Sequence, residues 1–146
     1  MSDGFKIPVP VNEPIKDYAP NSEEKKSLVA KIDELSSMKV EIPIIIDGKE
    51  IRTGDTGNCV KPYDHAHILG TYHKAGEEEV KMAIESSLDA WNDWSHTSFE
   101  YRAKIFLKMA ELLIGPHRDI INASTMLNMS KNAYQAEIDA ACELID

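Results

Sequence analysis

Two histidines that are close in the sequence have the spacing to do metal chemistry. His65 and His67 lie two positions apart, and side chains at such positions share one face of a β-strand, where both could ligate a metal ion. His73 lies nearby, but no third ligand follows at a metal-binding spacing, and the segment has the composition of a loop. We therefore expect surface or hydrogen-bonded histidines and assign no metal ligand.

The two cysteines lack the surroundings of a nucleophile. A catalytic thiolate needs a neighbouring base or a helix N-terminus to lower its pKa. Cys142 follows Ala140 and Ala141 near the C-terminal end of an expected helix and precedes Glu143, and both features would raise that pKa. We expect Cys142 and Cys59 to be small buried apolar side chains. Their wide separation predicts neither a disulfide scaffold nor a zinc site and fits a reducing compartment.

The glycines of the sequence form no phosphate-binding motif. Neither the dinucleotide-binding pattern of three glycines nor the P-loop pattern occurs, and the motifs of serine hydrolases and zinc proteases are also absent. From its motifs alone, the sequence contains no catalytic residue and no cofactor-binding residue.

Composition and charge exclude several classes of partner. The 146 residues correspond to about one domain, and 25 acidic residues against 16 basic ones give a net charge of −9. Binding to nucleic acid requires clustered basic residues, whereas the longest basic run is Lys25-Lys26. The longest apolar runs are three residues, against the roughly 20 of a membrane-spanning helix. No secretory signal or transit peptide is visible at the N-terminus. We expect neither nucleic-acid nor membrane partners.

The N-terminal elements are predicted from prolines and from apolar spacing. Four of the seven prolines fall within the first 20 residues, which predicts an extended arm over residues 1–21. Its apolar content predicts that the arm is packed against a surface; these residues are Phe5, Ile7, Val9, Val11 and Ile15. An apolar stripe then predicts an amphipathic helix over residues 22–38, with Asn21 as its cap and Glu24 completing a capping box.

Residues 40–74 are predicted to form a small antiparallel β section. Asp47-Gly48 predicts a hairpin with a type I′ turn, because this turn needs positive φ at both central residues. Pro43 places the first strand, Val40–Ile46, at a sheet edge or at the start of a sheet. Two further short strands are expected at Cys59–Lys61 and Ile68–His73, separated by a loop.

Residues 76–146 are predicted to be helical throughout. A first helix opens at Ala75 or Gly76, and Thr97 with Glu100 forms a capping box for a second. Gly115-Pro116 ends the second helix and starts a third, which runs to about Met129. A fourth begins near Asn132 and reaches the end of the chain. Because that helix ends without a cap, we expect the chain to be truncated before a catalytic domain. The segment is thus a helix-rich α+β fold with a β-hairpin and about four helices.

Several stretches together resemble the N-terminal part of the aldehyde dehydrogenase superfamily. They are the helix that begins Phe99-Glu-Tyr-Arg-Ala-Lys, the turn Ser130-Lys131-Asn132, the Pro62-Tyr-Asp-His-Ala-His loop and the run from Tyr134 to Asp146. The last run, which contains Gln-Ala-Glu-Ile-Asp and Glu-Leu-Ile-Asp, is specific to the branch that oxidises L-glutamate γ-semialdehyde. The sequence departs from the superfamily at 128–131, where Asn-Met-Ser-Lys replaces the commoner Gly-Gln-Gly/Ser-Lys.

The resemblance implies a fold and an activity. The full protein would have the superfamily's α/β fold, with residues 22–146 forming the N-terminal part of its NAD-binding domain. It would oxidise L-glutamate γ-semialdehyde to L-glutamate with NAD in proline degradation. The superfamily's nucleophilic cysteine, general-base glutamate and main NAD contacts would lie beyond this segment, so none is carried over to Cys59 or Cys142. Glu143 occupies the position of a glutamate that binds the substrate's α-ammonium group, and it is the one substrate-binding residue we expect.

The implied partners are a small-molecule substrate, the remainder of the same chain and further copies in a homo-oligomer. We expect a cytoplasmic protein, with the mitochondrial matrix after processing as the alternative. A different class of function is also compatible with the sequence: a non-enzymatic helical interaction module derived from a dehydrogenase N-terminus. Another aldehyde dehydrogenase branch is a third reading. A downstream nucleophile motif in the reading frame beyond Asp146 would separate these readings.

Overall fold

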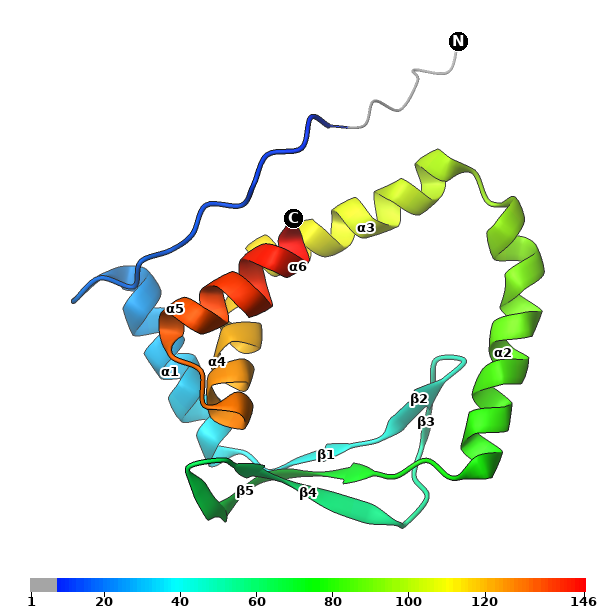
Figure 1. The fold of residues 1–146 in the computed structure, drawn as a ribbon, viewed down its shortest axis with the longest axis horizontal. Helices are drawn as coiled ribbons and strands as arrows, with labels where there is room; N and C mark the ends of the chain where they lie inside the picture. Colours follow the sequence, from blue (N-terminus) through cyan, green and yellow to red (C-terminus); the bar gives the residue numbers. More distant parts are fainter. Residues whose placement is uncertain (1–7) are drawn as a thin grey trace. The chain divides into compact units, whose positions relative to one another are not determined.

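A computed structural model describes residues 8–146 (Figure 1), so Phe5 and Ile7 of the predicted arm lie outside the described residues. These residues form two compact units, one made of 8–35 and 98–146 and the other of 36–97. The mixture of helices and short strands confirms the helix-rich α+β prediction. The elements are α1 (Glu23–Ser37), β1 (Val40–Ile42), β2 (Ile44–Ile46), β3 (Lys49–Ile51), β4 (Thr56–Lys61), β5 (Asp64–His73), α2 (Glu77–His96), α3 (Phe99–Ile114), α4 (Arg118–Met129), α5 (Ala133–Ala136), η1 (Glu137–Cys142) and α6 (Glu143–Ile145).

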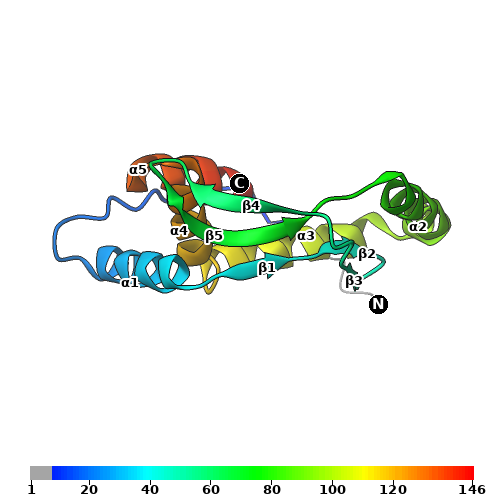
Figure 2. The same cartoon turned by 90° about the horizontal axis from the view of Figure 1, so that it is seen from below.

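The strands of the second unit form two sheets rather than one antiparallel section. β5 lies between β1 and β4 (Figure 2), antiparallel to β4 but parallel to β1, and the parallel pair corrects the prediction. The β2–β3 hairpin turns at Asp47 and Gly48, whose φ values of 53° and 68° are both positive as predicted. Pro43, which cannot donate to a ladder, separates β1 from β2 at the point where the chain leaves one sheet for the other.

The predicted loop between the last two strands is shorter in the structure. β4 begins at Thr56 and β5 begins at Asp64, so most of the expected loop is paired strand. The pairing contains irregularities between Cys59 and Lys61, where the register shifts twice. Such bulges break the alternation of side chains. The predicted strands end correctly at Lys61 and His73 but begin three and four residues too late.

Two predicted helix caps are each wrong by one residue. The side chain of Ser22, not of Asn21, accepts the cap hydrogen bond of α1, from the Lys25 amide at 3.3 Å. The side chain of Ser98, rather than of Thr97, caps α3 by accepting from the Tyr101 amide at 3.3 Å. Serine and threonine are equally good sequence signals for a cap, so neighbouring candidates were not distinguished by type.

The predicted final helix contains a π-helix. α5 and α6 flank η1, a six-residue π-helix spanning Glu137–Cys142. Four of these six residues are buried: Glu137, Ala140, Ala141 and Cys142. A π-turn contains one more residue than an α-turn, which no apolar spacing in the sequence indicated.

The apolar core of the first unit joins the arm to α1 and α4. Tyr18, Leu28 and Ala123 are buried together, at 6%, 2% and 0% exposure, and partly buried residues of α1 and α4 pack around them. The arm is therefore packed at Tyr18. The apolar residues expected to pack it, Val9, Val11 and Ile15, are exposed at 83%, 84% and 54%, so that part of the prediction is wrong. Among the helices of residues 8–146, none is both long enough and apolar enough to cross a bilayer.

Candidate functional site

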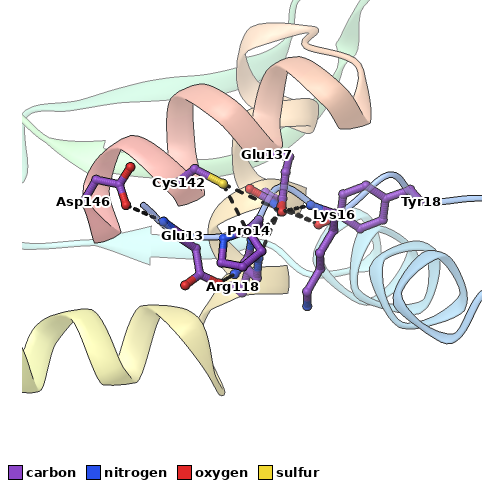
Figure 3. Close-up of polar contacts among 9 residues, drawn as sticks. Glu13, Pro14, Lys16, Tyr18, Arg118, Glu137, Cys142 and Asp146 are labelled. Carbon is purple, nitrogen blue, oxygen red and sulfur yellow. Dashed lines mark hydrogen bonds and ion pairs between the residues drawn. The ribbon is translucent and has the colours of Figure 1, made fainter. Parts of the chain in front are cut away.

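Three polar side chains are completely enclosed in the first unit, and they define the candidate site (Figure 3). Arg118 lies in the first turn of α4, Asn122 lies one turn further along the same helix, and Glu137 is the first residue of η1. Their exposed fractions are 2%, 0% and 0%. Buried charges are tolerated only when they are paired and hydrogen-bonded, so their partners decide whether the site is stable. We call Arg118, Asn122, Glu137 and their partners the buried polar cluster.

The guanidinium of Arg118 bridges two carboxylates. Its Nη2 pairs with Oε1 of Glu137, and its Nε donates to Oε2 of the same carboxylate at 3.3 Å. Its Nη1 pairs with Oε1 of Glu13 in the arm. Nη2 also donates to the carbonyl oxygen of Pro14 at 3.0 Å. A planar guanidinium presents five donors in a fixed geometry, and here those donors join the arm to η1.

The arm and α4 supply the remaining donors to Glu137. The amide of Lys16 donates to Oε1 at 2.8 Å, and the hydroxyl of Tyr18 donates to Oε2 at 2.7 Å. Nδ2 of Asn122 donates to the same Oε2 at 2.8 Å and to the Tyr18 oxygen at 2.9 Å. Both carboxylate oxygens therefore accept hydrogen bonds, and the donors come from α4 and from the arm. Oδ1 of Asn122 is buried and has no hydrogen-bond partner in residues 8–146.

The electrostatics of the cluster favour its charged forms. Burial alone would raise the pKa of Glu137, but hydrogen bonds from Arg118, Tyr18, Lys16 and Asn122 outweigh it and lower the pKa to about 2. Burial alone would lower the pKa of Arg118, and the two glutamates it contacts raise that pKa instead. Burial and the adjacent Glu137 raise the pKa of the Tyr18 hydroxyl. At neutral pH Arg118 and Glu137 are therefore charged and Tyr18 is neutral. Such a cluster stabilises the fold and is not suited to proton transfer.

Cys142 closes the cluster from the other end of η1. Its Sγ lies 3.9 Å from Oε1 of Glu137 and 3.7 Å from Nη2 of Arg118. Burial, followed by the negative charge of Glu137, raises the pKa of the thiol. A protonated, enclosed thiol is a poor nucleophile, in agreement with the buried side chain expected at this position. Cys59, in contrast, is only partly buried in β4.

The other residues singled out in the sequence lie apart from this cluster. Glu143 is the first residue of α6, directly after Cys142, and its side chain is exposed. His65 is exposed on β5, while Nε2 of His67 lies 2.9 Å from the carbonyl oxygen of Ser36. Within residues 8–146, no group of three or more His, Cys, Asp or Glu side chains is arranged to hold a metal ion.

The turn from β5 to α2, which has a glycine cap, does not have the properties of a nucleotide site. Gly76 caps α2 after β5, but its amide already donates to Oε2 of Glu79 at 2.7 Å. Three glutamates occupy the first turn of α2, and their charge opposes a phosphate at that helix end. These residues do not fit NAD.

Sequence reasoning missed the cluster, although it contained one local signal. Arg118 stands in the first turn of α4, where the helix dipole disfavours a cation. A basic residue at such a position indicates a partner elsewhere in the fold. Its partners Glu13 and Glu137 are separated from it by 105 and 19 positions, so no local motif joins them.

Comparison with known proteins decides the family. The model of the aldehyde dehydrogenase family matches residues 51–146. The chain belongs to the aldehyde dehydrogenase family. The family match covers α2 to α6 with most of the second unit, and the arm that completes the buried polar cluster lies before its first matched residue.

Named relatives narrow the similarity within the aldehyde dehydrogenases. A probable delta-1-pyrroline-5-carboxylate dehydrogenase of Schizosaccharomyces pombe is 42% identical over 97% of this chain and 26% of its own length. The human mitochondrial delta-1-pyrroline-5-carboxylate dehydrogenase is 37% identical over 92% of this chain and 24% of its own length. A solved Delta-pyrroline-5-carboxylate dehydrogenase from Mycobacterium tuberculosis, bound with NAD, is 42% identical with a TM-score of 0.95 over 100% of this chain and 28% of that one. The chain thus spans about a quarter of the length of the relatives it matches.

Proposed function

We propose that this chain is the N-terminal part of an NAD-dependent dehydrogenase that oxidises L-glutamate γ-semialdehyde to L-glutamate in proline degradation. The observation that carries the proposal is the 42% identity to a probable delta-1-pyrroline-5-carboxylate dehydrogenase over 97% of this chain. In this reaction the aldehyde carbon gains an oxygen from water and loses a hydride. NAD, when bound, accepts that hydride.

Within such an enzyme, this chain contributes structure and substrate recognition rather than the reacting groups. Cys142 is enclosed and its pKa is raised, so the attacking thiolate belongs to residues outside this segment. Gly76 and its acidic helix leave no place for a nucleotide phosphate, so NAD is held mainly by the rest of the enzyme. We assign residues 22–146 to the N-terminal part of the NAD-binding domain, with residues 1–21 as an arm.

Glu143 is the residue we assign to substrate binding. The substrate carries an α-ammonium group, and a carboxylate is its natural partner in a charge-assisted hydrogen bond. Glu143 is exposed at the start of α6, and its position matches the glutamate of the semialdehyde-oxidising branch. Its neighbour Cys142 is buried, so the chain passes at this point from an enclosed cluster to an accessible carboxylate.

We assign the enzyme a homo-oligomeric state from the family resemblance and a location from the names of its relatives. The relatives from Dictyostelium discoideum and human are named mitochondrial, which favours the mitochondrial matrix over the cytoplasm expected from the sequence. The partners are the small-molecule substrate, the remainder of the chain and further copies.

The assignment of Glu143 is tested in the longer enzyme that contains this chain. Glu143→Ala is expected to weaken binding of glutamate semialdehyde by about 1.5–3 kcal/mol, the value of a hydrogen bond to a charged group. The matched control substrate is 5-oxopentanoate, which keeps the aldehyde and the carboxylate but lacks the ammonium. Its kcat/KM should be unchanged. An equal loss with both substrates would assign Glu143 a structural role and reject this contact.

The proposal that the nucleophile lies outside this segment is tested with the isolated chain. Incubated with glutamate semialdehyde and NAD, it should form NADH only at the background rate, because no available thiolate is present. Turnover that disappears in a Cys142→Ala variant would overturn the proposal that the nucleophile lies outside this segment.

A further inference from the structure

The backbone immediately before Glu143 is a π-turn, and that turn determines which face of the helix carries Glu143. The amide of Glu143 donates to the carbonyl oxygen of Ile138, five residues back, instead of four. Successive residues of an α-helix are rotated by about 100°. The extra residue of a π-turn therefore rotates everything after it by about that angle relative to an uninterrupted α-helix. The direction of Glu143 depends on whether the π-turn is kept.

The buried polar cluster contacts both ends of this π-turn. Glu137 is the first residue of η1 and Cys142 is the last, and Oε1 of Glu137 lies 3.9 Å from Sγ of Cys142. In an α-helix, side chains five positions apart point about 140° away from each other. Here they share one side and both lie within contact of Nη2 of Arg118 (Figure 3). The contacts of Cys142 with Arg118 and Glu137 therefore depend on the π-turn, since an α-helical course would turn Cys142 away from the ion pair.

The arm also contacts the chain after Glu143, at Asp146. Through its carboxylate, Glu13 pairs with Arg118, and through its amide it donates to Oδ1 of Asp146 at 2.6 Å. Glu143 therefore lies between two fixed points, Cys142 within the cluster and Asp146 at the end of the arm contact. The arm residue Glu13 contacts Asp146 directly and reaches Cys142 only through Arg118.

We infer that Glu137 is a positioning residue for the substrate's ammonium group: its buried pair with Arg118, completed by the arm, holds the π-turn that directs Glu143. Glu137 does not touch substrate and acts through Glu143. The inference rests on the proposed function, since it needs Glu143 to bind the ammonium.

The test compares aldehyde discrimination in variants of the longer enzyme. Glu137→Gln removes the charge that holds Arg118, and Asp139→Asn is the matched control, because Asp139 lies in the same π-turn but pairs with the partly exposed Lys131 at 2.7 Å. For Glu137→Gln we expect KM for glutamate semialdehyde to rise about five- to tenfold relative to 5-oxopentanoate, with a smaller change in kcat. Asp139→Asn should leave the ratio unchanged.

A second variant covers the case in which Glu137→Gln does not fold. Tyr18→Phe removes one hydrogen bond to Glu137 and keeps the aromatic ring in the core. It should shift the same KM ratio in the same direction by about twofold. A purely structural role of the cluster would lower the yield or the Tm and reduce activity toward both aldehydes equally.

The outcomes separate this inference from the proposed function. If Glu143→Ala abolishes discrimination while Glu137→Gln and Tyr18→Phe retain it, Glu143 binds the ammonium without help from the cluster and the positioning role is overturned. If Glu143→Ala itself retains discrimination, the proposed substrate contact fails and the positioning role fails with it. Loss of discrimination in Glu143→Ala and in either cluster variant, with Asp139→Asn normal, supports both.

Discussion

Two regions of this chain reverse the usual distribution of charged and apolar side chains. In the buried polar cluster, Arg118 and Glu137 are enclosed, at 2% and 0% exposure. Along α2, by contrast, no residue is buried, and the apolar residues Leu88 and Trp91 are 67% and 68% exposed. The charges of the cluster can be enclosed because they are paired with donors and acceptors from three segments, whereas no segment among the described residues covers the apolar face of α2.

The two regions also differ in what stabilises them. The cluster depends on contacts between distant positions, such as Tyr18 with Glu137. α2 is stabilised by its own local interactions, including the bond from the Gly76 amide to Glu79 and an ion pair between Lys81 and Glu77 at 2.6 Å. Local interactions of this kind contribute a few tenths of a kcal/mol each. Substitutions should therefore have large effects in the cluster and small ones along α2.

The largest effect is expected from Arg118→Ala. It leaves the carboxylates of Glu137 and Glu13 enclosed without a counter-charge, which should lower the free energy of unfolding by about 3–5 kcal/mol. Urea unfolding followed by circular dichroism measures this change. The control is Lys131→Ala, which removes a partly exposed ion pair and should cost less than about 1 kcal/mol. Equal losses in the two variants would mean that enclosure adds nothing to the Arg118 pair.

Acid should weaken the cluster over a defined pH range. The pKa of Glu137 is about 2 in the folded chain, against an ordinary value of 4.5. The unfolded chain therefore takes up the proton first as the pH falls, and the stabilisation by Glu137 is complete above about pH 4.5 and lost by about pH 2. The pKa difference corresponds to about 3 kcal/mol.

The pH prediction is checked by comparing urea midpoints of the wild-type chain and Glu137→Gln across this range. The variant is expected to be less stable near neutral pH and to lose less stability in acid, because position 137 no longer titrates. Parallel pH curves for the two proteins would show that Glu137 does not contribute to acid sensitivity.

The contrast between the two regions also shows how far the sequence could predict this structure. The start of α2 was predicted at Ala75 or Gly76, and the β2–β3 turn was predicted from Asp47-Gly48; both signals are local. The parallel pairing of β1 with β5 was missed because it joins Val40 to Gly70, and short strands carry no signal of direction. Gly70 permits that pairing, since a Cβ there would lie 2.4 Å from the carbonyl oxygen of Val40.

The candidate site was only partly predictable, for the same reason. The role of Glu143 stays a prediction from its resemblance to a family run, and the cluster residues Glu13, Arg118 and Glu137 were missed because they come from three distant segments. The π-turn also hid the pattern, because Glu137 and Cys142 share a side at a spacing of five that no α-helical template contains. Apolar residues of α1 and η1 that contact the rest of the first unit are covered, as the burial of Leu28 and Ala140 shows. The exposed stripes lie on α2 and α3 instead.

Those exposed stripes predict self-association of the isolated chain. Val80, Ile84, Leu88 and Trp91 recur at helical spacing along α2, and all four are more than half exposed. Contiguous exposed apolar surface favours association in water. In size-exclusion chromatography the isolated chain should therefore elute with an apparent mass larger than that of a monomer. Leu88→Lys combined with Trp91→Lys should increase the monomer fraction. A monomeric wild-type chain with a sharp thermal transition would contradict this.

The smallest effect is expected from a single polar substitution on α2. Leu88→Gln should change the free energy of unfolding by no more than about 0.5 kcal/mol, because a side chain that is already exposed loses little when it becomes polar, and glutamine is nearly as good a helix former as leucine. Both tryptophans of the chain lie on α2, so tryptophan fluorescence during urea unfolding reports on this helix. The matched change in the core is Leu28→Ala, which should cost about 2–5 kcal/mol. A large loss from Leu88→Gln at low concentration, where association is negligible, would mean that the α2 stripe is packed in solution, and the contrast between the two regions would then disappear.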